Sequence, residues 1–212
     1  NEAVASTSGT SALHLAVAAI NPNPGDEIIV TPITDFGSVI PILAQTAVPV
    51  FADVDPDTWC TDPESIRANI TDRTKAIIVV HLFGQPADMD PILEIAAEHN
   101  IPVIEDCSQA YGATYKGKKV GTMGTIGCFS LQQSKHITAG DGGITVTNDP
   151  DLAKRMRLFS DKGWPREGSL RTHLFLGLNY RMTELHGAVA LAQLGKLDGV
   201  IEGRQHAGMM LS

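Results

Sequence analysis

Short apolar runs alternate with longer amphipathic patterns along the chain. Short apolar runs, typical of buried strands, lie at residues 27–31, 48–53, 76–81, 103–106, 127–130 and 144–147. Apolar residues with helical spacing lie at residues 10–19, 90–99, 151–158 and 183–197. Strands that alternate with helices indicate βαβ units around a mainly parallel sheet, so the pattern predicts an α/β fold.

Local signals add detail to this pattern. Asp88 or Asp90 can cap the helix that follows them, and Pro102 marks the end of that helix. The segment 188–197 is rich in Ala and Leu, which predicts a packed helix. The segment 161–173 mixes glycine, proline and charged residues, so we predict a mobile loop of the kind that often serves a function.

Composition narrows the class of protein. Hydrophobic residues make up 43% of the 212 residues and charged residues 19%, an ordinary globular composition that can fill a large core. The net charge of −8 argues against a nucleic acid or an anionic membrane as partner and favours small-molecule chemistry. No apolar run approaches the length of a membrane span, and residues 1–4 lack the pattern of a signal peptide, so we expect an untargeted protein.

The cysteines and histidines predict neither a metal site nor a redox motif. Cys60, Cys107 and Cys128 form no C-x-x-C pair, which fits a reducing cytoplasm. The seven histidines are scattered and form no H-E-x-x-H motif. We therefore expect no metal and a cytoplasmic location.

A small polar turn, Ser8-Gly9-Thr10-Ser11, leads into the first helical pattern. The free amide groups and positive end of a helix bind phosphate well. Simple N-capping by Ser8 or Thr10 is the alternative explanation, and this segment alone favours it.

Two adjacent acids, Glu105 and Asp106, end an apolar strand. Ligands of open α/β sheets lie beyond the carboxyl ends of the strands, so this is a favoured place for a site. A buried acid there needs a donor or a positive partner, such as a pyridinium nitrogen. In the alternative interpretation one acid caps a turn and the other faces water.

Lys135 follows another strand and precedes the glycine-rich segment 140–143. Such a lysine can be held against a ligand and become a nucleophile towards a carbonyl, although an ordinary surface lysine is the commoner case. Further along, Asn179 and Arg181 supply donors suited to phosphate or carboxylate, or alternatively a structural contact between Arg181 and a glutamate.

Five segments together resemble, in order and spacing, the motifs of the DegT/StrS-type aminotransferases of sugars and cyclitols: Ser8-Gly9-Thr10, residues 105–110, Phe129-Ser130 with Lys135 five residues on, Gly142-Gly143, and residues 177–181. The resemblance spans nearly the whole chain. It implies the aspartate-aminotransferase fold, with a three-layer large domain built on a seven-stranded mixed sheet, and pyridoxal 5′-phosphate as cofactor. Lys135 would hold the cofactor as a Schiff base and move the substrate proton, and Asp106 would pair with the pyridine nitrogen.

The resemblance also implies roles for the other cofactor-binding residues. Phe36 would stack on the cofactor ring, and Gln109 would bond near it. Asn179 would reach the cofactor phosphate of a neighbouring subunit, which implies a homodimer. The phosphate of the same subunit would be bound by Gly9, Thr10 and Ser130.

The reaction implied is transfer of an amino group from glutamate or glutamine to a keto-sugar or a keto-cyclitol. The segment 130–135 is more similar to the cyclitol branch of the family than to the nucleotide-sugar branch. By the same likeness, residues 1–200 would form a large cofactor-binding domain that is incomplete at its N-terminus. Residues 201–212 would begin the connection to a small C-terminal domain that is missing.

Three alternatives remain at this level. In a sugar dehydratase of the same fold a histidine replaces the lysine, and His136 stands next to Lys135. A non-catalytic relative would bind the cofactor without turnover. A nucleotide-binding module is the third, because residues 112–119 nearly spell a phosphate loop, but Lys119 stands where a hydroxyl should bind magnesium.

Overall fold

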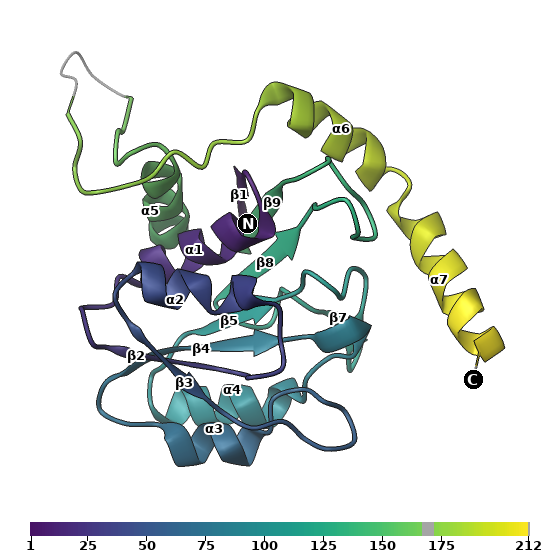
Figure 1. The fold of residues 1–212 in the computed structure, drawn as a ribbon, viewed down its shortest axis with the longest axis horizontal. Coiled ribbons are helices and arrows are strands. Elements are labelled where there is room, and N and C mark those ends of the chain that lie inside the picture. The colour runs from purple at the N-terminus through teal and green to yellow at the C-terminus, as the bar shows by residue number, and fades with distance from the viewer. Residues whose placement is uncertain (167–171, 212) are drawn as a thin grey trace.

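The computed structural model describes residues 1–166 and 172–211, so residues 167–171 of the predicted mobile loop lie outside the described residues. A seven-stranded sheet lies between two layers of helices, with strand order β1-β9-β8-β5-β4-β2-β3 (Figure 1). The strands are β1 (Glu2–Ser6), β2 (Glu27–Val30), β3 (Val48–Phe51), β4 (Thr74–Val80), β5 (Val103–Asp106), β8 (Ile126–Ser130) and β9 (Gly143–Thr147). The helices are α1 (Gly9–Ile20), α2 (Ile40–Ala44), α3 (Pro63–Asn69), α4 (Met89–Glu98), α5 (Pro150–Ser160), α6 (Glu184–Leu194) and α7 (Leu197–Leu211), with short 3₁₀ helices η1 (Phe36–Ser38) and η2 (Leu82–Gly84).

The sheet is mixed. Its central strands pair in parallel, whereas β9 runs antiparallel to both β8 and β1. All six predicted strands are present, and the predicted three-layer α/β class with a seven-stranded sheet is confirmed.

Both faces of the sheet are buried because its strands are apolar at successive positions. Ile28 and Ile78 point into a core shared with α1, α2 and α5. Ile29 and Ile77, their neighbours along the strands, point into a second core shared with α3 and α4.

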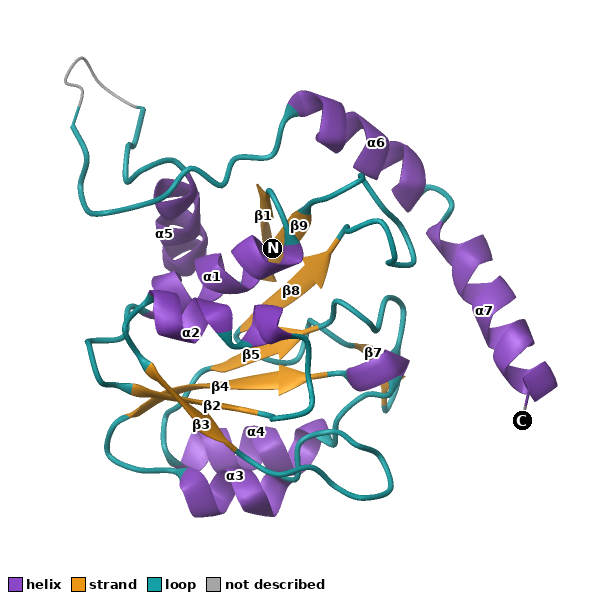
Figure 2. Cartoon of the chain, viewed as in Figure 1, coloured by secondary structure: helices purple, strands orange, loops and turns teal. Residues whose placement is uncertain are grey.

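The predicted helices are present, but two details differ from expectation. Asp88 occupies the N-cap position of α4, yet its side chain makes no capping bond and instead accepts a hydrogen bond from the hydroxyl of Tyr115. The prediction that 188–197 is a packed helix is correct only in part: Ala190 and Leu197 pack against a core cluster, but no residue of α6 is buried and the helix is interrupted after Leu194. Figure 2 shows why: α6 and α7 run end to end along one side of the molecule instead of lying on the sheet.

The segment that nearly spells a phosphate loop has another structure. Residues 114–119 form a small antiparallel hairpin of β6 (Thr114–Tyr115) and β7 (Lys118–Lys119), turned by Lys116 and Gly117 with positive φ. No helix follows this turn to bind a phosphate, which removes support for the nucleotide-binding alternative. None of the helices in the described residues is long and apolar enough to cross a membrane.

Candidate active site

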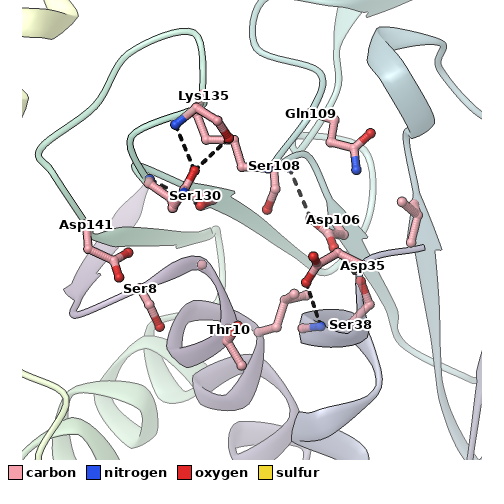
Figure 3. Close-up of a pocket in the computed structure, with 16 residues that line it drawn as sticks. Ser8, Thr10, Asp35, Ser38, Asp106, Ser108, Gln109, Ser130, Lys135 and Asp141 are labelled. Carbon is pink, nitrogen blue, oxygen red and sulfur yellow. Dashed lines mark hydrogen bonds between the residues drawn. The ribbon is translucent and has the colours of Figure 1, made fainter.

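A cavity of about 300 Å³ opens at the carboxyl edge of the sheet (Figure 3). Its position follows from the topology, because β5 and β8 are parallel neighbours whose ends meet at this edge, with Asp106 opposite Cys128. The chain between β1 and α1 reaches the same edge from the other side. The lining residues are Ser8, Gly9, Thr10, Leu13, Asp35, Gly37, Ser38, Val80, Asp106, Ser108, Gln109, Ser130, Gln132, Ser134, Lys135 and Asp141.

One wall is the N-terminus of α1. Ser8 and Ser11 form a reciprocal capping box, with amide-to-hydroxyl distances of 3.0 and 2.8 Å, so the N-capping interpretation is confirmed. The same helix end also faces the cavity, so the two interpretations are compatible. A Cβ at Gly9 would lie 2.6 Å from Cβ of Ser130, and only glycine lets this helix end approach β8 so closely.

Asp106 lies opposite this helix end and is only 6% exposed. Its Oδ2 accepts a hydrogen bond of 2.8 Å from the hydroxyl of Ser38, and its Oδ1 accepts one of 3.0 Å from the amide of Ser108. Ser38 reaches it from η1, whose start Asp35 caps through the amide of Gly37. Since a carboxylate oxygen can accept two hydrogen bonds, each oxygen of Asp106 can take one more donor.

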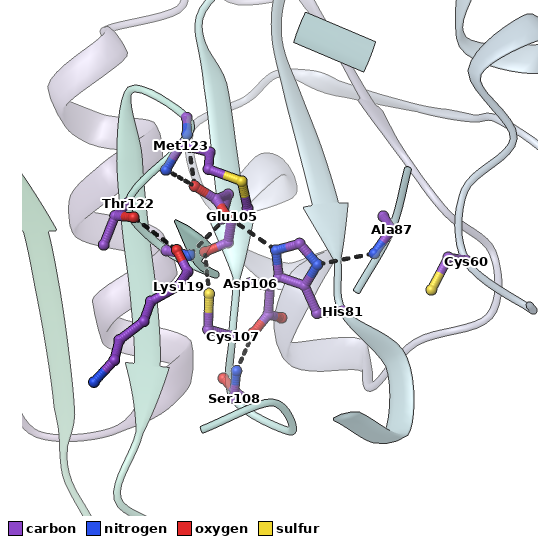
Figure 4. Close-up of polar contacts among 12 residues, drawn as sticks. Cys60, His81, Ala87, Glu105, Asp106, Cys107, Ser108, Lys119, Thr122 and Met123 are labelled. Carbon is purple, nitrogen blue, oxygen red and sulfur yellow. Dashed lines mark hydrogen bonds and ion pairs between the residues drawn. The ribbon is translucent and has the colours of Figure 1, made fainter. Parts of the chain in front are cut away.

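Glu105, the other acid of the pair, is fully buried beneath the site (Figure 4). Its carboxylate accepts hydrogen bonds from the amides of Gly121, Met123 and Gly124 at 2.6 to 2.8 Å, and from Nε2 of His81 at 3.0 Å. Burial alone would raise the pKa of Glu105, but His81 and the amides lower it below its ordinary value. The interpretation in which one acid faces water is therefore wrong, because both acids are buried.

Glu105, His81 and Cys107 also bring three potential metal-binding atoms within 4.8 Å of one another. These atoms already have protein partners: Nδ1 of His81 accepts from the amide of Ala87, and the thiol of Cys107 points at a carbonyl oxygen. Burial, with the charges of Glu105 and Asp106, raises the pKa of the Cys107 thiol well above its ordinary value. A protonated thiol is a poor ligand and a poor nucleophile, so this cluster is a structural network.

Lys135 lines the same cavity as Asp106 (Figure 3). The loop that carries it is closed by backbone hydrogen bonds, from Leu131 to Gly142 at 2.8 Å and from Ala139 to Leu131 at 2.9 Å. In the part of the chain that the structure describes, no hydrogen bond or ion pair involves Nζ of Lys135. Its amine is therefore available to a ligand.

His136 faces another direction. It is not among the residues that line this cavity, and its ring packs near Tyr111 with centroids 5.6 Å apart. The geometry therefore favours the lysine over the histidine as the residue facing Asp106.

The structure brings together six of the eight candidate residues: Gly9, Thr10, Asp106, Gln109, Ser130 and Lys135. Gln109 is oriented by the amide of Phe83, which donates to its Oε1 at 2.9 Å. Phe36 adjoins the cavity through η1 but does not line it, and the residue is 62% exposed.

Asn179 lies away from the cavity of its own chain. It forms an isolated β-bridge with Asp161, whose carboxylate accepts hydrogen bonds from Lys162, Arg166 and Arg181. The bond from Arg166, with those from its other partners, lowers the pKa of Asp161 far below its ordinary value. The predicted structural contact of Arg181 is thus with an aspartate rather than a glutamate.

Sequence reasoning missed several residues of the site. Ser38, which bonds to Asp106, belongs to no motif. Ser108 and Asp141 lie within the segments 105–110 and 140–143, but the family resemblance implies no role for either of them. The sequence does contain a signal for His81, the buried partner of Glu105, because His81 directly follows β4 at the same edge of the sheet.

The chain matches the DegT/DnrJ/EryC1/StrS aminotransferase family over residues 1–212 and belongs to that family. It is 47% identical over 205 residues to the GDP-perosamine synthase of Caulobacter vibrioides, covering 96% of this chain and 54% of that protein. It is 44% identical over 218 residues to the L-glutamine:2-deoxy-scyllo-inosose aminotransferase of Streptomyces kanamyceticus, covering 98% and 51%. The chain thus spans about half the length of the curated relatives it matches.

A solved structure shows the same fold. NtdA from Bacillus subtilis, with bound cofactor PMP, superposes with a TM-score of 0.87 at 32% identity, covering 93% of this chain and 45% of that one. The family resemblance expected from the five sequence motifs is confirmed.

Proposed function

We propose that the protein is a pyridoxal-phosphate-dependent aminotransferase that moves an amino group from glutamate or glutamine to a keto-sugar or keto-cyclitol. The observation that carries this proposal is that Lys135 and Asp106 line one cavity, together with the N-terminus of a helix. A primary amine, a buried carboxylate and a phosphate-binding helix end are the three groups that this cofactor requires.

The residues present fit the cofactor. The α1 N-terminus, with Gly9, Thr10 and Ser130, is suited to its phosphate, and the lack of a side chain at Gly9 lets this helix end lie close to Ser130. Asp106, already oriented by Ser38 and Ser108, is suited to accept a hydrogen bond from the ring nitrogen. When bound, pyridoxal phosphate supplies an electron sink for charge that develops at the substrate α-carbon.

Two residues act on the reaction in this proposal. Lys135, whose amine is unpaired, would hold the cofactor and would move a proton at the substrate α-carbon once the substrate amine has taken its place. Asp106 would keep the ring nitrogen of the cofactor protonated. Gln109, held by the amide of Phe83, lies where it can bond to the ring substituents.

Phe36 and Asn179 have proposed roles that need more than the cavity of one chain. The exposed ring of Phe36 is available to stack on the cofactor from η1. Asn179 does not line its own cavity, which fits a role at the cofactor phosphate of a second copy in a homodimer. We propose residues 1–200 as the cofactor-binding domain, and the three free, buried cysteines fit a cytoplasmic location.

The relatives support both acceptor classes. One is named for a GDP-linked sugar and the other for a cyclitol, with glutamine as donor. Preference for the cyclitol branch stays a prediction from residues 130–135.

Absorbance and chemical trapping test the proposal. Addition of pyridoxal phosphate should produce a visible band, and borohydride followed by peptide mapping should locate the label on Lys135. Lys135→Ala should abolish the trapped product, whereas His136→Ala should keep it. No trapping in the wild-type protein supports the dehydratase alternative, and trapping without turnover of glutamate supports a non-catalytic relative.

A further inference from the structure

A second cavity, of about 300 Å³, adjoins the first at Lys135. The two share Ser108, Gln109, Ser134 and Lys135, so they meet where the reaction is proposed to occur. The second cavity is completed by Phe83, His136 and Arg204. A third cavity, of about 240 Å³, continues from it and again includes His136 and Arg204.

The charge of these two outer cavities differs from that of the first. The first is lined by three acids, Asp35, Asp106 and Asp141. Among the described residues that line the outer two, none is acidic, whereas Lys135 and Arg204 are both cationic. A cationic recess in a chain of net charge −8 attracts a small anion.

The donors of this recess lack protein partners. Nδ1 of His136 is shielded from solvent and has no hydrogen-bond partner among the described residues. The same part of the chain offers no hydrogen bond or ion pair to the guanidinium of Arg204. Burial, and then the charges of Arg204 and Lys135, lower the pKa of His136 below its ordinary value. An anion bound in the recess would pair with the guanidinium of Arg204, which lines both outer cavities.

Packing fixes the helix that carries Arg204. Ile201 lies one turn earlier on α7 and contacts Gly112, where an added Cβ would approach Cδ1 of Ile201 to 2.3 Å. Leu197 packs against the cluster that includes Tyr111 and Leu131. Arg204 is therefore presented to the recess by a helix that is anchored at two points.

We propose that Arg204, together with His136, forms a subsite that binds a carboxylate of the amino donor. This inference rests on the proposed transamination. A donor is favoured because Lys135 also lines the recess. One small amino acid can therefore reach both the Lys135 amine and the site of the bound carboxylate. The planar guanidinium matches a carboxylate through two parallel hydrogen bonds.

Binding of glutarate tests the subsite, because this dicarboxylate has no amino group to transfer. Titration calorimetry would be run on the whole chain, with and without pyridoxal phosphate. We expect Arg204→Gln to weaken glutarate binding by about 10-fold or more, and Arg204→Lys to weaken it less. The control Arg73→Gln alters an arginine paired with Glu27 and outside the cavities, and should leave binding unchanged.

The outcomes separate the two proposals. Failure of the wild-type chain to take up the cofactor would refute the proposed function, whereas the glutarate titration without cofactor still tests the subsite. Equal glutarate affinity in wild type and Arg204→Gln, or no glutarate binding at all, would overturn the inference. It would also be overturned if Arg204→Gln weakened binding of GDP but not of glutarate, because the subsite would then serve the acceptor. Unchanged cofactor absorbance in Arg204→Gln would confirm that the variant is folded.

Discussion

The sheet region, from β1 to α5, and the C-terminal helices α6 and α7 bury their apolar residues to very different extents. In the sheet region, Ile104 and Ile126 are fully buried between two helical layers. On α6, Leu185 and Leu191 are 81% and 72% exposed. Similar residue types therefore contribute differently to stability, because the free energy gained depends on the area removed from water.

Removing the carboxylate of Glu105 should have the largest effect on stability. Glu105→Ala leaves three backbone amides and the buried His81 without their acceptor, so we expect a loss of about 3–5 kcal/mol in the free energy of unfolding. Urea denaturation measures this loss. Glu64→Ala, an exposed acid on α3, is the control and should change stability by less than about 0.5 kcal/mol.

Truncation of a buried side chain in a central strand should have the next largest effect on stability. Ile104→Ala in β5 removes a fully buried side chain and should cost about 3 kcal/mol, from lost burial and the cavity left behind. The denaturant midpoint should fall without a change in slope. A cost below about 1 kcal/mol would mean that the core around β5 is loosely packed.

Acid should destabilise the junction between the two regions. His14 on α1 bonds to Tyr180, which precedes α6, and to Gln45, and burial lowers the pKa of His14 from 6.5 to about 4. Between pH 6.5 and about 4, His14 therefore binds a proton in the unfolded chain but not in the folded one. The free energy of unfolding falls as the pH falls through this range. We expect His14 to account for a loss of roughly 2 kcal/mol between pH 7.5 and pH 5.

The measurement for this prediction is the pH dependence of unfolding in wild type and in His14→Gln. The glutamine keeps a polar side chain but does not titrate, so its stability should decline less over the same pH range. Identical pH profiles would contradict the assigned role of His14.

The smallest effect is expected on α6. Leu191→Ala should change the free energy of unfolding by less than about 0.5 kcal/mol, because the side chain is mostly exposed in this chain. The same denaturation experiment measures it beside Ile104→Ala. A loss comparable to that of Ile104→Ala would show that Leu191 is buried by a contact that a single chain does not provide.

Sequence pattern predicted the interior of the fold better than its margins. The central strands are continuous apolar runs, and buried parallel strands have this appearance. Strand β1 went unpredicted because Glu2–Ser6 consists of small and polar residues and owes its strand form to pairing with β9. Helix α7 was missed because Gly199, Gly203 and Gly208 interrupt its helical pattern.

The candidate site was predictable where residues follow strands or open a helix. Asp106 ends an apolar strand and Lys135 lies five residues beyond another, and the topology brings them to one edge. The contacts of Ser38 and Arg204 were not predictable, because they depend on tertiary packing of η1 and α7 that no local pattern records. The exposure of α6 has the same cause, because its Ala and Leu content indicates a helix but not what covers it.

The first cavity takes its walls from five stretches of chain that lie far apart in sequence, from Ser8 near one end to Asp141. Such a cavity has no counterpart in a partly folded chain, since each stretch is positioned by a different strand or helix. A ligand bound there recognises only the finished fold and shifts the folding equilibrium towards it. Binding of the cofactor should therefore raise the melting temperature of the sheet and both helical layers in a single transition. The ligand then reports on folding as well as on chemistry.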